Sequence, residues 1–262
     1  MTTASGAELL RAMHHGPQPL VLPNVWDAAS ARAYAEAGFP ALATSSSAVA
    51  ATLGYADGQT PRDEMLAAVA RIARSVSVPV TADIEHGYGL APRELVARLL
   101  AAGIVGCNLE DSDPTTRTLM DPLQQADYLA AVRAEAGPEL VLNARVDVFV
   151  RPMPAGEDNA VGFAVRRAGA YLTAGADCAY PILAPAESLP ELVAGISGPV
   201  NAMQRPGGPT LAELAAVGIA RITFGGGLHA RVADDVRDMA SSLASERSAL
   251  AHDQRSGSDS TP

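Results

Sequence analysis

Basic residues, long apolar runs and cysteines are all scarce in this sequence, and each scarcity excludes a class of protein. The 19 basic residues are outnumbered by 29 acidic ones, for a net charge of −10, so the chain lacks the basic surface that nucleic-acid binding requires. No apolar run is long enough to span a bilayer. The N-terminus has no basic segment followed by an apolar one, so we expect no signal peptide.

Only two cysteines are present, Cys107 and Cys178, and both lie in expected strands without metal-type spacing. Such residues are typical of buried thiols in a cytoplasmic protein, which is the location that we expect. The 262 residues are 48% hydrophobic and 18% charged. A chain of this length and composition is long enough to bury one large α/β core.

Apolar strands alternate with helices along the chain. Four junctions share one pattern, a helix that ends at or next to a glycine and is followed by an apolar strand: AEAGFPAL, LAAGIVGCNL, LTAGADCAY and AAVGIARITF. Glycine at such a junction is a helix C-cap. Eight strands are expected: Pro19–Val25, Ala41–Ser45, Val78–Glu85, Gly106–Asp111, Leu140–Phe149, Asp177–Leu183, Pro199–Met203 and Arg221–Phe224.

These strands are too continuously apolar for a half-exposed antiparallel sheet, which indicates parallel strands covered by helices. Eight strand–helix units close into a (β/α)8 TIM-type barrel, predicted as a single domain over residues 1–244. The rival is a doubly wound open sheet, which needs no eighth unit. The segment Ser45–Gln59 is expected to be a polar loop. Residues 245–262, rich in Ser, Asp and Gly, are predicted to be a disordered tail.

The stretch Val80–Gly89, VTADIEHGYG, starts as a buried strand and ends as a glycine-bracketed turn. Its carboxylates Asp83 and Glu85 lie two residues apart, so they project from the same face of the strand. Two carboxylates on one buried face repel each other unless a cation or a proton joins them. Solvated acids at an exposed strand end are the alternative interpretation of this stretch alone.

Charged residues also end the next two strands, Glu110 and Asp111 on one and Arg145 and Asp147 on the other. The active site of a barrel lies at the carboxyl ends of its strands, which are about 4.8 Å apart, so these groups can meet over one spot. Several acids without histidine or cysteine partners suit Mg2+ or Mn2+, bound partly through water. The alternative is an ion-pair network that closes the barrel mouth.

The second strand runs into Ser45, Ser46 and Ser47. Hydroxyls and backbone amides at a helix start suit a carboxylate or a phosphate, although ordinary capping also explains them. Asp57 lies farther along the same segment and could reach a metal through water, or could be a simple turn residue.

Five segments of the chain carry a resemblance: SSSAVAATLGYAD, ADIEHGYG, GCNLED, NARVD and VNAM. Together they resemble the isocitrate lyase/phosphoenolpyruvate mutase superfamily, over residues from about Leu20 to Val236. Members of that superfamily are barrels that handle 2-oxo or 2-hydroxy acids with Mg2+. The resemblance also implies a homotetramer in which the C-terminal helix is exchanged between subunits.

The resemblance implies a role for each candidate site residue. Asp83 would bind the metal directly, with Asp57, Glu85 and Glu110 holding it directly or through water. Arg145 would bind the substrate oxygens, Ser45, Ser46 and Ser47 the substrate carboxylate, and Asn201 would face the same pocket. Arg145, Glu110 and Asp57 are the expected catalytic residues.

One departure from the superfamily pattern bears on the reaction. The lyases carry a Lys-Arg-Cys-Gly-His loop after the fourth strand, whereas this chain has DSDPTTRTLMDP there, without cysteine or histidine. We therefore expect a Mg2+-dependent lyase that cleaves a C–C bond of a small 2-oxo or 2-hydroxy carboxylate, by decarboxylation or a retro-aldol route. The alternatives are a phosphoenolpyruvate/phosphonopyruvate mutase or hydrolase with C–P chemistry, and a barrel that binds a carboxylate without turning it over.

Overall fold

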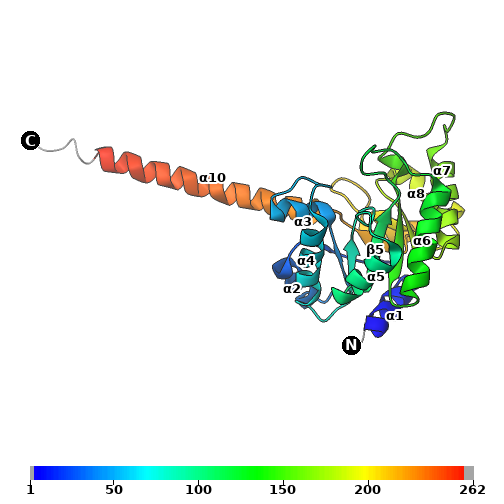
Figure 1. The fold of residues 1–262 in the computed structure, drawn as a ribbon. Coiled ribbons are helices and arrows are strands. Elements are labelled where there is room, and N and C mark those ends of the chain that lie inside the picture. Colours follow the sequence, from blue (N-terminus) through cyan, green and yellow to red (C-terminus); the bar gives the residue numbers. More distant parts are fainter. Residues whose placement is uncertain (1–2, 257–262) are drawn as a thin grey trace, which may run out of the picture.

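The computed structural model describes residues 3–256 and has the predicted (β/α)8 architecture (Figure 1). Neighbouring strands all pair in parallel and follow the order of the chain. A single bridge between Ala179 and Val200 joins the sixth strand position to the seventh. The strands beyond the first position are β3 (Leu42–Thr44), β4 (Val80–Asp83), β5 (Gly106–Glu110), β6 (Val141–Val146), β7 (Cys178–Pro181), β8 (Asn201–Met203) and β9 (Arg221–Thr223).

The first strand position is split in two. The predicted strand Pro19–Val25 appears as β1 (Leu20–Val21) and β2 (Asn24–Val25), separated by Pro23, which has no N–H to donate to a neighbouring strand. The first half pairs with β9 and the second half with β3. The two ends of the sheet therefore meet, which excludes the open-sheet alternative.

Helices cover the outside of the barrel, and their apolar faces form the main core against the strands. They are α2 (Ala28–Glu36), α4 (Arg62–Ala73), α5 (Pro92–Ala101), α6 (Pro122–Ala136), α7 (Ala160–Thr173), α8 (Leu189–Gly195) and α9 (Leu211–Val217). The N-terminal helix α1 (Thr3–Met13) closes the foot, where Leu10 belongs to one buried cluster with Val105 and Val141. None of the helices within residues 3–256 is long and apolar enough to cross a membrane.

A helix occupies part of the segment that was expected to be a polar loop. Helix α3 (Ser46–Leu53) starts behind Ser45, whose hydroxyl accepts the backbone N–H of Ala48, and ends at Gly54 in the left-handed region. The serines look polar in the sequence, but Ser45 acts as the helix cap, and the run that follows contains several alanines. The start of this helix is thereby placed beside the carboxyl ends of β3 and β4.

The last helix, α10 (Gly227–Ser256), is longer than predicted and projects away from the barrel (Figure 1). The prediction of a disordered tail from residue 245 is wrong as far as Ser256, and residues 257–262 lie outside the described residues. From Leu228 to Ser256 the sequence contains neither glycine nor proline and many alanines. Nothing in it breaks the helix, although its composition is polar.

Candidate active site

The carboxyl ends of the strands surround a cavity of about 590 Å3. The structure brings together at this cavity all but one of the residues to which the resemblance gave a role. They are Ser45, Ser46, Ser47, Asp57, Asp83, Glu85, Glu110 and Arg145. The exception is Asn201.

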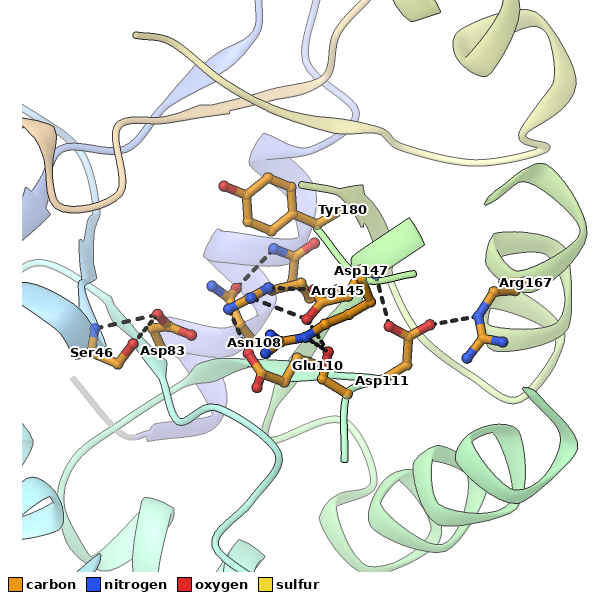
Figure 2. Close-up of polar contacts among 12 residues, drawn as sticks. Ser46, Asp83, Asn108, Glu110, Asp111, Arg145, Asp147, Arg167 and Tyr180 are labelled. Carbon is orange, nitrogen blue, oxygen red and sulfur yellow. Dashed lines mark hydrogen bonds and ion pairs between the residues drawn. The ribbon is translucent and has the colours of Figure 1, made fainter. Parts of the chain in front are cut away.

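Asp83, the last residue of β4, is held by the start of α3 (Figure 2). Its Oδ2 accepts the hydroxyl of Ser46 at 2.8 Å and the backbone N–H of Ser46 at 3.3 Å. Its Oδ1 is buried and has no hydrogen-bond partner within the described residues. One carboxylate oxygen is thus fixed by the protein, while the other remains unsatisfied beside the cavity, which is a costly arrangement unless a ligand completes it.

The turn that follows β4 contains unusual backbone. Glu85 (φ +53°) and Tyr88 (φ +56°) both adopt the left-handed region, which non-glycine residues visit rarely and which concentrates at functional sites. The Tyr88 hydroxyl donates to Glu85 Oε1 at 3.1 Å. Burial, together with the nearby Asp83 carboxylate, raises the pKa of Glu85 to about 7.

Gly87 packs that turn against helix α6. A Cβ atom added at Gly87 would lie 2.6 Å from the hydroxyl of Tyr128, and the residue has φ +83°. The same hydroxyl donates to the carbonyl of Leu90 at 3.1 Å. The aromatic residue and the glycine together set the position from which Glu85 reaches the cavity.

Arg145 forms the ion-pair part of the site (Figure 2). Its Nη1 lies 2.5 Å from Glu110 Oε2, and its Nε lies 2.7 Å from Asp147 Oδ1. Its Nη2 donates to Asp147 Oδ2 at 3.2 Å. Burial raises the pKa of Glu110, against the opposing effect of the Arg145 guanidinium. An ion-pair network therefore exists at the mouth, but within the described residues it includes neither Asp83 nor Glu85.

Asp57 reaches the cavity from the segment after α3. Asp57 is an exposed residue, but partial desolvation raises the pKa of its carboxyl, with a further contribution from the Asp83 carboxylate. Asp57, Asp83 and Glu85 therefore form a group of acids that share one space and lack ion-pair partners among residues 3–256. Within the same residues, no three Asp, Glu, His or Cys side chains are grouped so that they could hold a metal by themselves.

The serines of α3 face the turn after β9. Ser45 Oγ and Ser47 Oγ lie 3.0 Å apart, and a Cβ atom at Gly226 would lie 2.9 Å from Ser47 Oγ. Asn24, which the sequence analysis did not single out, holds this turn. Its Oδ1 accepts the N–H groups of Phe224 and Gly225 at 2.7 and 3.0 Å. Its only sequence signal is an amide side chain near the end of the first strand.

Asn201 does not line the cavity, contrary to the prediction. It is the first residue of β8, so it lies below the carboxyl end of that strand, where Met203 lines the cavity instead. The Asn201 side chain is fully buried and donates to the backbone carbonyl of Arg221 and to the hydroxyl of Thr223. Its contacts hold neighbouring strands together beneath the site.

Asp111 also lies outside the cavity. Its Oδ2 accepts Nε of Arg167 at 2.7 Å and the hydroxyl of Tyr171 at 2.8 Å, and its Oδ1 accepts the backbone N–H of Asp147 (Figure 2). It therefore ties helix α7 to the ends of β5 and β6. Further polar residues that the sequence analysis did not place also line the cavity, among them Asn108, Arg117, Arg151 and Tyr180. The two arginines lie on loops, where periodicity gives no signal.

Known proteins that are similar in sequence and structure agree with this fold. The phosphoenolpyruvate phosphomutase family model matches residues 10–244. An uncharacterized protein of Mycobacterium tuberculosis is 36% identical over 217 residues, which cover 81% of this chain and 80% of that protein. A solved structure from Burkholderia cenocepacia J2315, provisionally named a phosphonomutase, is 40% identical with a TM-score of 0.84, over 90% of this chain and 99% of its own. Oxaloacetate acetylhydrolase, solved with its product oxalate, is 25% identical with a TM-score of 0.81, over 92% of this chain and 87% of its own.

The closed parallel barrel and the acidic cavity at the carboxyl ends of its strands define a TIM-barrel enzyme. The chain belongs to the isocitrate lyase/phosphoenolpyruvate mutase superfamily. Its relatives with an assigned reaction include 2-methylisocitrate lyases. The chemistry of this protein is therefore of the lyase or mutase class.

Proposed function

We propose that this protein is a Mg2+-dependent lyase that cleaves a C–C bond of a small 2-oxo or 2-hydroxy carboxylate. The observation that carries the proposal is Asp83. One of its oxygens is fixed by Ser46 and the other is buried without a hydrogen-bond partner among the described residues, at the edge of a cavity that three more carboxylates line. This is the arrangement expected where a cation completes the site.

The residues present fit a hard divalent cation. The unsatisfied Oδ1 of Asp83 would bind it directly, and Asp57, Glu85 and Glu110 would hold it directly or through water. Mg2+ keeps several waters and takes few protein ligands, which agrees with the absence of a ready-made group of three ligands in the described residues. Mn2+ would fit the same oxygens. When bound, the cation would polarise the 2-oxygen of the substrate as a Lewis acid.

The substrate carboxylate would bind at the start of α3. Ser45, Ser46 and Ser47 line the cavity there, and backbone N–H groups at a helix start favour an anion. The opposing Gly225–Gly226 turn leaves room beside Ser47 that a side chain would fill. Arg145, held in place by Glu110 and Asp147, would stabilise negative charge that develops on the substrate oxygen as the C–C bond breaks.

The residue types that the sequence and the cavity lining lack limit the possible reaction mechanisms. The 262-residue sequence contains no lysine, so a Schiff-base route through a lysine is excluded. The residues lining the cavity include neither cysteine nor histidine. The groups lining the cavity that remain as candidates for proton transfer are its carboxylates and the hydroxyl of Tyr180.

The experiment is a proton NMR screen of the purified protein with Mg2+, with and without chelator. The panel contains oxaloacetate, isocitrate, methylisocitrate, dimethylmalate, phosphoenolpyruvate and phosphonopyruvate. Chelator-sensitive cleavage of a C–C substrate supports the proposal. Conversion of phosphonopyruvate alone favours C–P chemistry. The similarity to the Burkholderia cenocepacia protein supports this alternative. Metal-dependent binding of oxalate without any turnover favours the carboxylate-binding alternative.

We also propose that the chain forms a homotetramer through α10. Val232, Val236, Met239 and Leu243 are all exposed on this helix, and Leu243 is 65% exposed. Their spacing of four, three and four residues places them on one side of the helix. An apolar stripe on a helix that projects from its own barrel suits burial against another copy of the chain.

A further inference from the structure

Tyr180 belongs to a row of three polar side chains on neighbouring strands. Glu110 on β5 is in register with Arg145 on β6, and Arg145 is in register with Tyr180 on β7. Residues in register on parallel strands point to the same face of a sheet, and all three line the cavity. Figure 2 shows the Tyr180 hydroxyl directed away from Asp147 and Arg167. The cavity wall therefore contains a phenol next to the arginine that is proposed to stabilise charge on the substrate.

A buried network beneath the cavity decides the direction of the hydrogen bond at Tyr180. Oδ1 of Asn201 accepts Nδ2 of Asn143 at 3.0 Å, which leaves Nδ2 of Asn201 as the donor on its other side. That Nδ2 donates to the hydroxyl oxygen of Thr223 at 3.1 Å. The Thr223 hydroxyl keeps its own hydrogen and donates it to the Tyr180 oxygen across 3.5 Å. Because Tyr180 is the acceptor in this contact, its own hydrogen points elsewhere.

The hydrogen of the Tyr180 hydroxyl has no acceptor within residues 3–256. The residue is only 3% exposed, and burial raises its pKa to about 12, so the phenol keeps its proton at neutral pH. The Ser46 hydroxyl, by contrast, is committed to Asp83. A buried O–H group without an acceptor costs free energy that a ligand oxygen in the cavity would recover.

We propose that Tyr180 is a catalytic residue whose hydroxyl donates a hydrogen bond to the substrate oxygen that becomes negatively charged as the C–C bond breaks. Thr223 and Asn201 are positioning residues, because they fix the direction of that hydrogen. The inference rests on the proposed function, in which Arg145 stabilises charge on the same oxygen. A hydrogen bond to a charged oxygen is stronger than one to a neutral oxygen, so this contact stabilises the transition state more than the ground state.

The test is calorimetric binding of oxalate in the presence of Mg2+, which does not depend on turnover. Oxalate carries full negative charge on oxygens arranged as in the enolate of a 2-oxo acid. Tyr180→Phe removes only the hydroxyl and should weaken oxalate binding by about 10-fold to 100-fold. The affinity for Mg2+ alone should stay within about twofold of the wild type. The matched control is Tyr34→Phe on α2, where the ring packs against Phe39, and this variant should change neither affinity.

Thr223 tests the direction of the hydrogen. Thr223→Val removes the donor to Tyr180 and should weaken oxalate binding by about 2-fold to 10-fold. Thr223→Ser keeps a hydroxyl and should weaken it less than Thr223→Val does. In the Tyr180→Phe background, Thr223→Val should have no further effect, because both residues act on one hydrogen bond. Additive effects of the two changes would refute the positioning role of Thr223.

The outcomes separate this inference from the proposed function. If the wild type binds oxalate with Mg2+, and Tyr180→Phe binds it as tightly as Tyr34→Phe does, the inference is wrong and the proposed function stands. Equal weakening of Mg2+ alone and of oxalate by Tyr180→Phe also overturns it, because the tyrosine would then act on the whole cavity. If the wild type binds no oxalate with Mg2+, the proposed function fails and this inference fails with it. Should Tyr180→Phe not fold, the comparison of Thr223→Val with Thr223→Ser decides.

Discussion

Ser46 donates both its hydroxyl and its backbone N–H to a single oxygen of Asp83. The serine is the first residue of α3 and the aspartate is the last of β4, so this contact joins the proposed carboxylate site at the start of α3 to the proposed cation site. The second oxygen of Asp83 has no hydrogen-bond partner in the part of the chain that the structure describes, so it is available to a ligand.

The contact between Ser46 and Asp83 predicts that replacing the aspartate has a larger effect than replacing the serine. Asp83→Asn should abolish Mg2+-dependent turnover, because it removes the negative charge of the carboxylate whose Oδ1 is buried and has no hydrogen-bond partner among residues 3–256. Ser46→Ala should lower metal affinity by about 10-fold to 100-fold, the usual cost of removing a group that orients a metal ligand. Metal titration by calorimetry and turnover measure the two effects. Equal effects of both variants would contradict the proposed division of roles.

Replacing Arg145 should affect both stability and turnover. Arg145→Gln leaves Glu110 and Asp147 buried without a counter-charge, which should lower the free energy of unfolding by about 3–5 kcal/mol. Arg145→Lys keeps the positive charge but loses the paired N–H donors of the guanidinium. It should therefore retain much more stability than Arg145→Gln but little of the wild-type activity. Urea unfolding and turnover are the measurements, and an active Arg145→Gln enzyme would refute the assigned role.

The turn after β4 permits a steric test. Gly87→Ala should destabilise the protein more than Gly89→Ala, because both glycines have positive φ but only Gly87 has the Tyr128 hydroxyl within 2.6 Å of an added Cβ. The strain of a left-handed alanine alone costs about 1–2 kcal/mol. Adding Tyr128→Phe should bring Gly87→Ala down to the level of Gly89→Ala. The comparison uses urea midpoints, and no recovery in the double variant would show that the clash is not with the hydroxyl.

Stability should depend on pH through His14. Burial, followed by the charge of Arg221, lowers the pKa of this histidine from 6.5 to about 4. Between these two values the unfolded chain holds a proton that the folded chain excludes, so the free energy of unfolding falls as the pH falls. The loss amounts to about 3 kcal/mol at most and is complete near pH 4.

The variant His14→Gln should lack that dependence, whereas His15→Gln, at an exposed neighbour, should keep it. The comparison must be made between variants, because the raised pKa of Glu85 gives a pH dependence of the opposite sign. Urea unfolding between pH 7.5 and pH 4 is the measurement. Parallel curves for the wild type and His14→Gln would contradict the assignment.

Association through α10 should be sensitive to charge on its apolar stripe. The double variant Val236→Glu/Met239→Glu should yield a smaller species in light scattering than the wild type, because it places charges where the exposed apolar side chains lie. Ser241→Glu, on the opposite side of the helix, is the matched control and should leave the mass unchanged. A monomeric wild type at micromolar concentration would refute the homotetramer.

Local patterns were sufficient to predict the barrel, since each apolar strand and each glycine-terminated helix is a feature of a few neighbouring residues. The secondary-structure prediction was wrong at two segments where it relied on polar composition alone. Serines made α3 look like a loop, although Ser45 caps a helix. The polar end of α10 looked disordered, although Leu228–Ser256 contains no helix breaker.

The sequence predicted the acidic residues of the site better than the other polar residues around them. Asp83 and Glu110 lie at strand ends, which the sequence pattern marks. The prediction for Asn201 was wrong because this residue begins β8 and lies in the core, whereas Met203, two residues farther along the same strand, lines the cavity. The sequence pattern does not show which of these two positions reaches the cavity. The position of Arg151 depends on its contact with Ser112, 39 residues away in the chain, and no local pattern contains that information.

The split first strand has a consequence for how the chain reaches its fold. The seam between β1 and β9 joins segments far apart in the chain, and Asn24 Oδ1 accepts the backbone N–H of Phe224, 200 residues away. The ring of strands cannot close until β9 has been synthesised. Contacts so distant in sequence slow folding, and until they form, β1 and β8 present open edges to other chains. The last strand therefore governs how long a nascent chain is exposed to aggregation.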